Sequence, residues 1–132
     1  MLPERVGAVI IQDNRILLVT GYEELFYWTP GGKIENGETH QVCLGRELES
    51  ELGGRLTSLK YYTSYKLINE AEQKTQMNYY YFVEFNGVLV PQEEITKTFW
   101  YSQQNFLNRC PKISKGLEEE LIPRLIQDRI LS

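Results

Sequence analysis

The chain has 132 residues, of which 42% are hydrophobic and 24% charged, and its 14 Lys and Arg against 18 Asp and Glu give a net charge of −4. These values are typical of one globular domain with a core of its own, and the acidic balance argues against a nucleic-acid polymer as a partner. Two cysteines, Cys43 and Cys110, are too few for a disulfide scaffold, and no long apolar run opens the chain, so we expect a single domain over residues 1–132, in the cytoplasm and without a membrane partner.

Two apolar runs rich in β-branched residues open the chain. Residues 6–11 and 15–20 flank the turn-forming pair Asp13-Asn14, so the pattern predicts a β-hairpin. Because both runs are apolar almost throughout, we expect burial on both faces, as in a sheet with helices on either side.

A glycine turn follows these runs. After a loop over residues 21–25, residues 26–28 read as a short strand that leads into Pro30-Gly31-Gly32. A second turn is predicted at Asn36-Gly37, just before a helical segment.

The segment between Thr39 and Gly53 has the pattern of a helix. Thr39 is a candidate N-cap, Gly53 a candidate C-terminal stop, and no proline lies between them. At about 100° per residue, Glu47, Ser50 and Glu51 share one helical face. The adjacent face carries an apolar stripe with a four-residue repeat, formed by Leu44, Leu48 and Leu52. The helix therefore presents carboxylates beside a surface suited to packing on a core.

The rest of the chain alternates between strand and helix patterns. Strands are predicted at residues 55–67, 77–85 and 96–101, with a polar loop at residues 69–74. Ser102 is a candidate cap for a short helix through Leu107. A last helix, interrupted or restarted at Pro123, carries Leu117, Leu121 and Leu125 at helical spacing. This order predicts an α/β fold with a mixed β-sheet between helical layers.

The central segment resembles the Nudix box. That pattern is a glycine, five residues, a glutamate, seven residues, Arg-Glu, an aliphatic residue, any residue, Glu-Glu, any residue, glycine and an aliphatic residue. The positions in register are Gly32, Glu38, Arg46, Glu47, Leu48, Glu51 and Gly53. Two positions depart, since Ser50 replaces the first glutamate of the pair and Gly54 replaces the last aliphatic residue.

The resemblance implies a Nudix-type α/β/α sandwich and a divalent metal, Mg²⁺ or Mn²⁺, held by hard oxygen ligands. It places metal-binding and catalytic roles on Glu47 and Glu51, with a backbone carbonyl around Gly31-Gly32, assigned to Gly32, as a further ligand. Arg46 would orient the glutamates. Glu38 and Ser50 would lie behind the ligands. MutT-like members carry another acidic ligand six residues before a tryptophan, a spacing that selects Glu94 ahead of Trp100, although Glu93 is adjacent.

Substrate contacts are less constrained by the pattern. Tyr22 and Trp28 could stack on a nucleobase, with core packing the stronger reading for Trp28, and Lys33 follows the glycine turn directly. Glu94 could equally be an ordinary loop residue, and His40 reads as a surface residue of the first helical turn. Glu49 cannot replace Ser50, because it lies about 200° around the helix from Glu47.

The resemblance implies a metal-dependent hydrolase that cleaves a diphosphate linkage in a nucleoside diphosphate derivative. A MutT-like nucleotide pyrophosphohydrolase is the first reading within that class, acting on a small molecule as a monomer or homodimer. The alternative is a catalytically silent Nudix domain that binds a nucleotide or a partner protein, because the serine removes one expected carboxylate.

Overall fold

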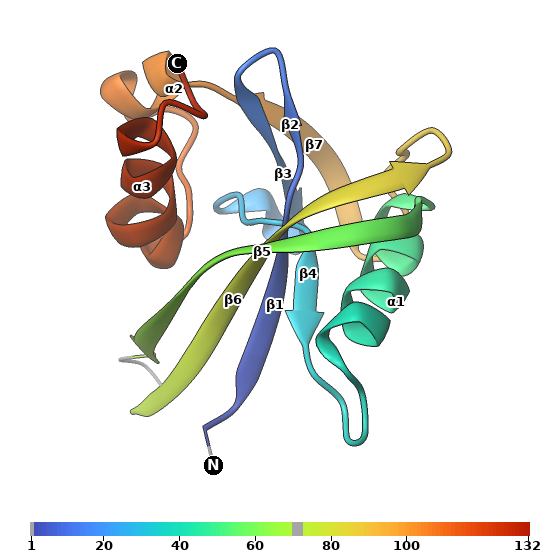
Figure 1. Cartoon of the computed structure of the whole chain (residues 1–132). Coiled ribbons are helices and arrows are strands. Elements are labelled where there is room, and N and C mark those ends of the chain that lie inside the picture. The colour runs from blue at the N-terminus through green and yellow to red at the C-terminus, as the bar shows by residue number, and fades with distance from the viewer. Residues whose placement is uncertain (1, 70–72) are drawn as a thin grey trace.

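The computed structural model describes residues 2–69 and 73–132. Within them the elements follow the order shown in Figure 1. They are β1 (Glu4–Val9), β2 (Ile11–Gln12), β3 (Arg15–Gly21), the 3₁₀ turn η1 (Tyr22–Glu24), β4 (Gly31–Lys33), α1 (His40–Leu52), β5 (Arg55–Asn69), β6 (Lys74–Asn86), β7 (Ile95–Tyr101), α2 (Gln103–Asn108), the π turn η2 (Leu117–Leu121) and α3 (Ile122–Gln127).

The strands form two sheets rather than the one expected. The first is mixed, with the order β4-β1-β6-β5, and β1 runs parallel to β6. The second has the order β2-β3-β7, and its pairs are antiparallel. In Figure 1 the terminal helices lie on one side of the strands and α1 lies on the other. The predicted α/β arrangement of a mixed sheet between helices is confirmed, with the second sheet as an addition.

The predicted hairpin over residues 6–20 is only partly correct. The chain leaves the first sheet after Val9, so β1 pairs with β4 and β6, while only the short β2 pairs with β3. The turn itself is as expected, because Asp13 and Asn14 both have positive φ, at 53° and 61°, the backbone that tight hairpins favour. Both apolar runs are buried, so local sequence could not show that they belong to different sheets.

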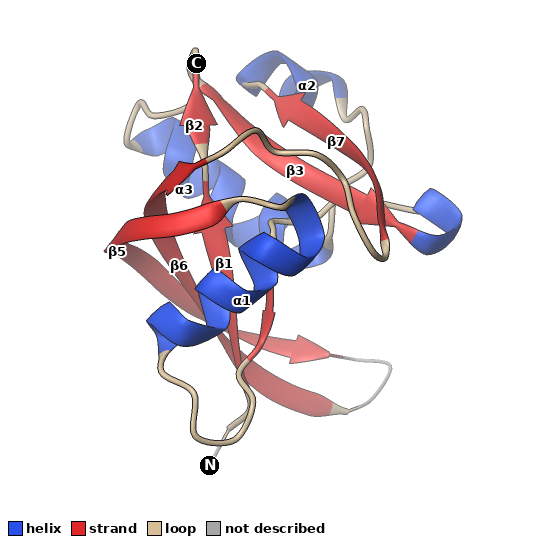
Figure 2. Ribbon diagram, turned by 90° about the vertical axis from the view of Figure 1, so that its right-hand side faces the viewer, coloured by secondary structure: helices blue, strands red, loops and turns tan. Residues whose placement is uncertain are grey.

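Helix α1 matches its predicted ends and its predicted face. The Thr39 side chain accepts a hydrogen bond from the backbone N–H of Val42 at 3.1 Å, and Gly53 closes the helix in the left-handed region with φ 72°. The three leucines of the stripe are fully buried. Figure 2 shows this helix lying across the strands of the first sheet.

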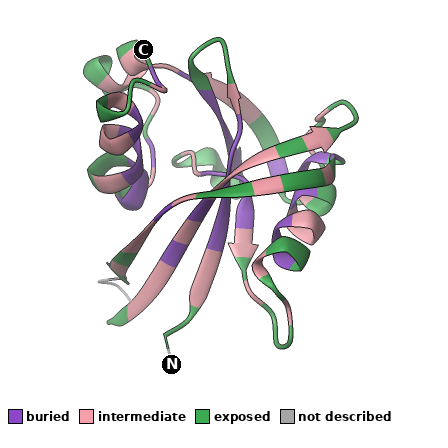
Figure 3. Ribbon diagram, in the orientation of Figure 1, coloured by how far each residue is buried: buried purple, intermediate pink, exposed green. Residues whose placement is uncertain are grey.

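Two apolar clusters hold the helices to the strands. One lies under α1 and contains its leucines together with Val6, Ala8, Leu17 and Val19. The other lies under the terminal helices and includes Leu117, Leu121 and Leu125, so the predicted leucine spacing does face the core. Figure 3 shows burial concentrated on the central strands and on the inward sides of the helices.

Other predicted elements shift at their ends. β5 extends to Asn69 and β6 begins at Lys74, so the expected polar loop is shorter, and its residues 70–72 lie outside the described part of the chain. Residues 26–28 form only isolated bridges, between Val19 and Trp28 and between Tyr27 and Ile113. Ser102 caps α2 as expected.

Across the described residues, every helix is too short or too polar to cross a membrane.

Candidate active site

The carboxylate of Glu47 lies directly over the glycine turn. A Cβ atom added to Gly32 would come within 2.6 Å of the Glu47 carboxyl carbon and 2.7 Å of its Oε1. A side chain at position 32 would displace the Glu47 carboxylate, so glycine allows this close approach without a special backbone angle. The box helix and the turn are therefore in direct contact at this carboxylate.

Glu51 contacts the same turn one residue earlier. Its Oε1 accepts a hydrogen bond from the backbone N–H of Gly31 at 2.9 Å. Burial raises the pKa of Glu51 to about 7, the hydrogen bond from Gly31 opposes this rise, and the charge of Glu47 adds to it. Two carboxylates thus converge on Gly31-Gly32, and that of Glu51 is largely buried.

Arg46 binds the carboxylate of Glu47 and that of a second residue, Glu38. Its guanidinium binds Glu38 in a fork, with Nε donating to Oε2 at 2.7 Å and Nη2 donating to Oε1 at 2.9 Å. Nη1 donates to Oε1 of Glu47 at 2.6 Å. The fork lowers the pKa of Glu38 to about 2, and Glu38 also accepts the backbone N–H of Glu35 at 2.9 Å. Glu38 therefore joins the loop before α1 to Arg46.

The loop after β6 is attached to the end of the box helix. The backbone N–H of Val90 donates to the carbonyl of Leu52 at 2.9 Å, and that of Gln92 donates to the carbonyl of Glu51 at 2.8 Å. These bonds bring Glu94, which is exposed, close enough for its charge to raise the pKa of Glu51. Glu93 has positive φ, at 54°.

The two departures from the box have different surroundings. Ser50 is exposed on the helix surface, as is Glu49. At Gly54, an added Cβ would meet Cδ2 of Leu89 at 2.5 Å and the Leu48 side chain at 3.4 Å. Leu89, from the loop that carries Glu94, therefore fills the space that an aliphatic side chain at position 54 would take.

A cleft of about 480 Å³ opens on the side of the first sheet that faces the terminal segment. One wall is aromatic, since Phe26 and Trp28 make an edge contact with ring centroids 5.8 Å apart. Leu67 and Leu117 also line it. Thr29 lines the cleft as well, so the cleft begins beside the glycine turn that receives the carboxylates.

The sequence-based substrate candidates are placed differently from one another. Trp28 lines this cleft and also packs against the cluster under α1, so both of its readings apply. Lys33 is exposed at the end of β4. Tyr22 is 87% exposed on η1, outside the set of described residues that line the cleft.

His40, expected to be a surface residue, is partly exposed and has a partner at each ring nitrogen. Its Nδ1 lies 2.6 Å from the hydroxyl of Tyr81 and its Nε2 lies 2.8 Å from Oε1 of Glu4, which ties the start of α1 to the first sheet. Its ring also packs on Tyr79, with centroids 4.6 Å apart.

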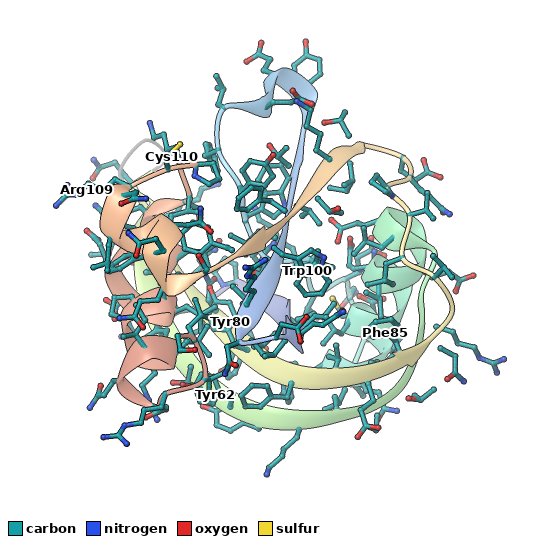
Figure 4. The ribbon with its side chains drawn as sticks, turned by 90° about the horizontal axis from the view of Figure 1, so that it is seen from above. Tyr62, Tyr80, Phe85, Trp100, Arg109 and Cys110 are labelled. Atoms are coloured by element: carbon teal, nitrogen blue, oxygen red, sulfur yellow. The ribbon has the colours of Figure 1, made fainter. Side chains whose placement is uncertain are left out.

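The polar lining of the cleft was missed from sequence. Arg5, Gln76 and Asn78 all line it, and Asn78 is only 6% exposed. Asn78 accepts a hydrogen bond from Nε2 of Gln76 at 2.8 Å and reaches the hydroxyl of Tyr80 at 3.4 Å. A signal existed, because asparagine is uncommon within a strand and stands here beside aromatic residues. Figure 4 shows Tyr80 in the interior, while Arg109 and Cys110 lie on the outside of the terminal segment.

The donor chemistry of the site fits a hard divalent cation. Glu47 and Glu51 place carboxylate oxygens at the same turn, and the burial of Glu51 together with the charge of Glu47 is an environment that a bound cation would relieve. The described residues contain no compact group of three His, Cys, Asp or Glu side chains. Two carboxylates are thus assembled, and Glu94 stands nearby rather than beside them.

The family comparison decides the class. The family description NUDIX domain matches residues 1–124 of this chain. The chain belongs to the Nudix family. As a Nudix protein, it is a hydrolase of the class that acts on phosphorus anhydrides.

Individual Nudix proteins extend this comparison. The protein of Bacillus subtilis (strain 168) named "Putative 8-oxo-dGTP diphosphatase YtkD" is 29% identical over 110 residues, covering 80% of this chain and 68% of that protein. The MutT NUDIX hydrolase from Burkholderia pseudomallei is 26% identical, with a TM-score of 0.68 over 76% of this chain and 83% of its own. A NUDIX hydrolase from Nitrosomonas europaea has a TM-score of 0.80 at 20% identity, over 98% and 91%, and shows the shared fold.

Proposed function

We propose that this Nudix domain is a metal-dependent pyrophosphohydrolase of the MutT-like kind, which cleaves the diphosphate linkage of a nucleoside diphosphate derivative with water. The observation that carries the proposal is the convergence of Glu47 and Glu51 on Gly31-Gly32. The geometry is specific, because the Glu47 carboxylate occupies the space that a side chain at Gly32 would take, and the Glu51 carboxylate accepts a hydrogen bond from the N–H of Gly31.

Mg²⁺ or Mn²⁺ would be held by Glu47 and Glu51, with the Gly32 carbonyl and Glu94 as further ligands. Such a cation neutralises phosphate charge and makes water a better nucleophile. Residues of the chain prepare the site for it. Arg46 keeps the Glu47 carboxylate in place through its bond to Oε1, and Glu38 keeps Arg46 in place in turn.

The substrate would lie with its phosphates at the carboxylates and its nucleoside in the cleft. Flat apolar groups on the cleft walls, from Phe26 and Trp28, suit the faces of a base. Gln76 and Asn78 provide amide groups, which can both donate to and accept from a base edge. Lys33, which is exposed at the end of the strand that contains the glycine turn, would approach the phosphates.

The test is a hydrolysis screen over a panel of nucleoside triphosphates and nucleotide sugars with Mg²⁺ and Mn²⁺, in which the nucleoside monophosphate is the product measured. Because the Bacillus subtilis relative is named for 8-oxo-dGTP, that compound and dGTP belong in the panel. We expect metal-dependent release of a nucleoside monophosphate from at least one triphosphate. Nucleotide binding without product from any compound would favour the silent binding domain and would overturn the proposal.

A further inference from the structure

Arg5 lies in a cross-strand row that joins the glycine turn to the cleft. On β1 it is paired with Lys33 of β4 on one side and with Asn78 of β6 on the other. Asn78 is in turn paired with Tyr65 of β5. Because directly paired residues project from the same face of a sheet, the row runs from an edge lysine through Arg5 to the buried amide of the cleft.

The guanidinium is held by a residue beside the turn. Nη2 donates to the carbonyl of Thr29 at 2.9 Å, and Nη1 lies 3.3 Å from its Oγ1. Thr29 is 1% exposed, so the Arg5 guanidinium is held by a buried residue. Two of the five N–H groups of the guanidinium can serve these bonds, which leaves donors for a ligand in the cleft that Arg5 lines.

Within residues 2–69 and 73–132, the charge of Arg5 has no directly paired carboxylate. Among the described residues, no carboxylate forms an ion pair with it, although Arg46 has three such partners. Arg5 does act at longer range, since burial raises the pKa of both Glu51 and Tyr80 and the charge of Arg5 opposes part of each rise. It therefore stands between the carboxylate site and the cleft, and a half-buried cation without a counter-ion is costly unless a ligand provides one.

We propose that Arg5 binds the phosphate group attached directly to the nucleoside, and so fixes which end of the substrate enters the cleft. The inference rests on the proposed function and adds a specificity residue to it. A guanidinium suits this task, because its planar fork binds phosphate oxygens in pairs.

The alternative is that Arg5 only braces Thr29 and the turn. That role would affect ligands with and without a phosphate equally. A binding experiment that compares dGMP with deoxyguanosine separates the two roles, and it is performed in EDTA so that neither metal nor turnover contributes.

The variants are Arg5→Gln, which removes the charge, and Arg5→Lys, which keeps the charge and loses the fork. Arg15→Gln is the matched control, because Arg15 is exposed at the start of β3 and outside the cleft lining. Thermal unfolding of each variant reports whether it is folded. If Arg5→Gln does not fold, Arg5→Lys carries the test.

We expect Arg5→Gln to weaken dGMP binding by roughly 10- to 100-fold, the range for a lost charge-assisted hydrogen bond, and to leave deoxyguanosine affinity unchanged. Arg5→Lys should weaken dGMP binding less, and Arg15→Gln should weaken neither ligand. Equal losses for both ligands, no loss for dGMP, or a wild-type protein that binds dGMP no more tightly than deoxyguanosine would each overturn the inference. Failure of the hydrolysis screen is a separate result, since this binding does not require turnover.

Discussion

The backbone N–H of Gly31 donates a hydrogen bond to Oε1 of Glu51 at 2.9 Å, which joins the strand that opens the box to the helix that closes it. Gly31 belongs to β4, which pairs with β1, and Glu51 lies in the last turns of α1. Both residues of this hydrogen bond lie in regular secondary structure, which fixes their backbone positions. The carboxylate therefore has a defined position before any ligand binds, which is the condition for a preorganised site.

Glu51→Gln tests the charge of this carboxylate without removing its hydrogen bond, because the Gln carbonyl oxygen can still accept from Gly31. We expect kcat/KM on the best substrate of the panel to fall by more than about 100-fold, above the usual effect of a residue behind a metal ligand. The free energy of unfolding should be unchanged or higher, since burial disfavours the ionised Glu51.

Glu49→Gln is the matched control for that measurement. It makes the same chemical change two positions earlier, on an exposed part of the helix. It should leave both rate and stability as in the wild type. A Glu51→Gln protein with the wild-type rate would show that the site is misplaced.

The role of Glu94 in the loop after β6 is tested by comparison with its neighbour Glu93. Glu94→Gln should lower the rate more than Glu93→Gln, because Glu94 acts electrostatically on Glu51 and the loop is fixed to α1 by its backbone. A loss of roughly 10-fold or more is expected for Glu94, against less than about 2-fold for Glu93. The measurement is kcat/KM at saturating Mg²⁺. Equal and negligible effects would remove Glu94 from the site.

Leu89 fills the space beside Gly54, so substitutions at these two positions should have non-additive effects on the free energy of unfolding. Gly54→Val should lower the free energy of unfolding by about 1–3 kcal/mol, because the new side chain meets Leu89 in a filled space. Leu89→Ala should cost about 1–2 kcal/mol through lost packing. In the double variant the valine takes the vacated space, so the combined loss should be smaller than the sum by more than about 0.5 kcal/mol. Additive losses in urea denaturation would show that the two positions do not share that space.

The box helix could be predicted from sequence because its determinants are local. Thr39 caps it, Gly53 ends it, and the leucine repeat fixes the buried face. The approach of Glu47 to Gly32 follows from the same spacing once helix and turn are packed together. These features depend on short distances along the chain.

The rest of the site depends on pairing that local sequence does not encode. Arg5 and Asn78 meet because β1 runs parallel to β6, more than 70 positions later, a pairing that the expected hairpin had no place for. Leu89 likewise occupies the space of the aliphatic side chain that is missing at Gly54, so a distant loop packs against the end of the helix. Such contacts are set by the topology of the sheets, so their residues read as ordinary strand or loop residues beforehand.

Ser50→Glu tests the departure that bears most on activity. The helix places residue 50 near the directions of Arg46 and Glu47, and Ser50 is exposed, so a longer side chain has room. An ionised oxygen ligand would replace a neutral hydroxyl beside two existing carboxylates. We expect metal affinity to rise, so the Mg²⁺ concentration that gives half-maximal activity should fall by about 10-fold or more. Parallel Mg²⁺ and Mn²⁺ titrations of both proteins, on the same nucleotide panel, provide the measurement.

Ser50→Gln is the control for this titration, because it adds a side chain of similar length without the charge. It should leave the half-maximal Mg²⁺ concentration at the wild-type value. If Ser50→Glu and Ser50→Gln shift that concentration equally, the effect belongs to side-chain size and not to a restored ligand. If neither the wild type nor Ser50→Glu gives metal-dependent product while both bind nucleotide, the missing carboxylate is not what limits turnover. The cleft would then serve binding alone, because a site that had kept the rest of its machinery should gain activity when the carboxylate returns.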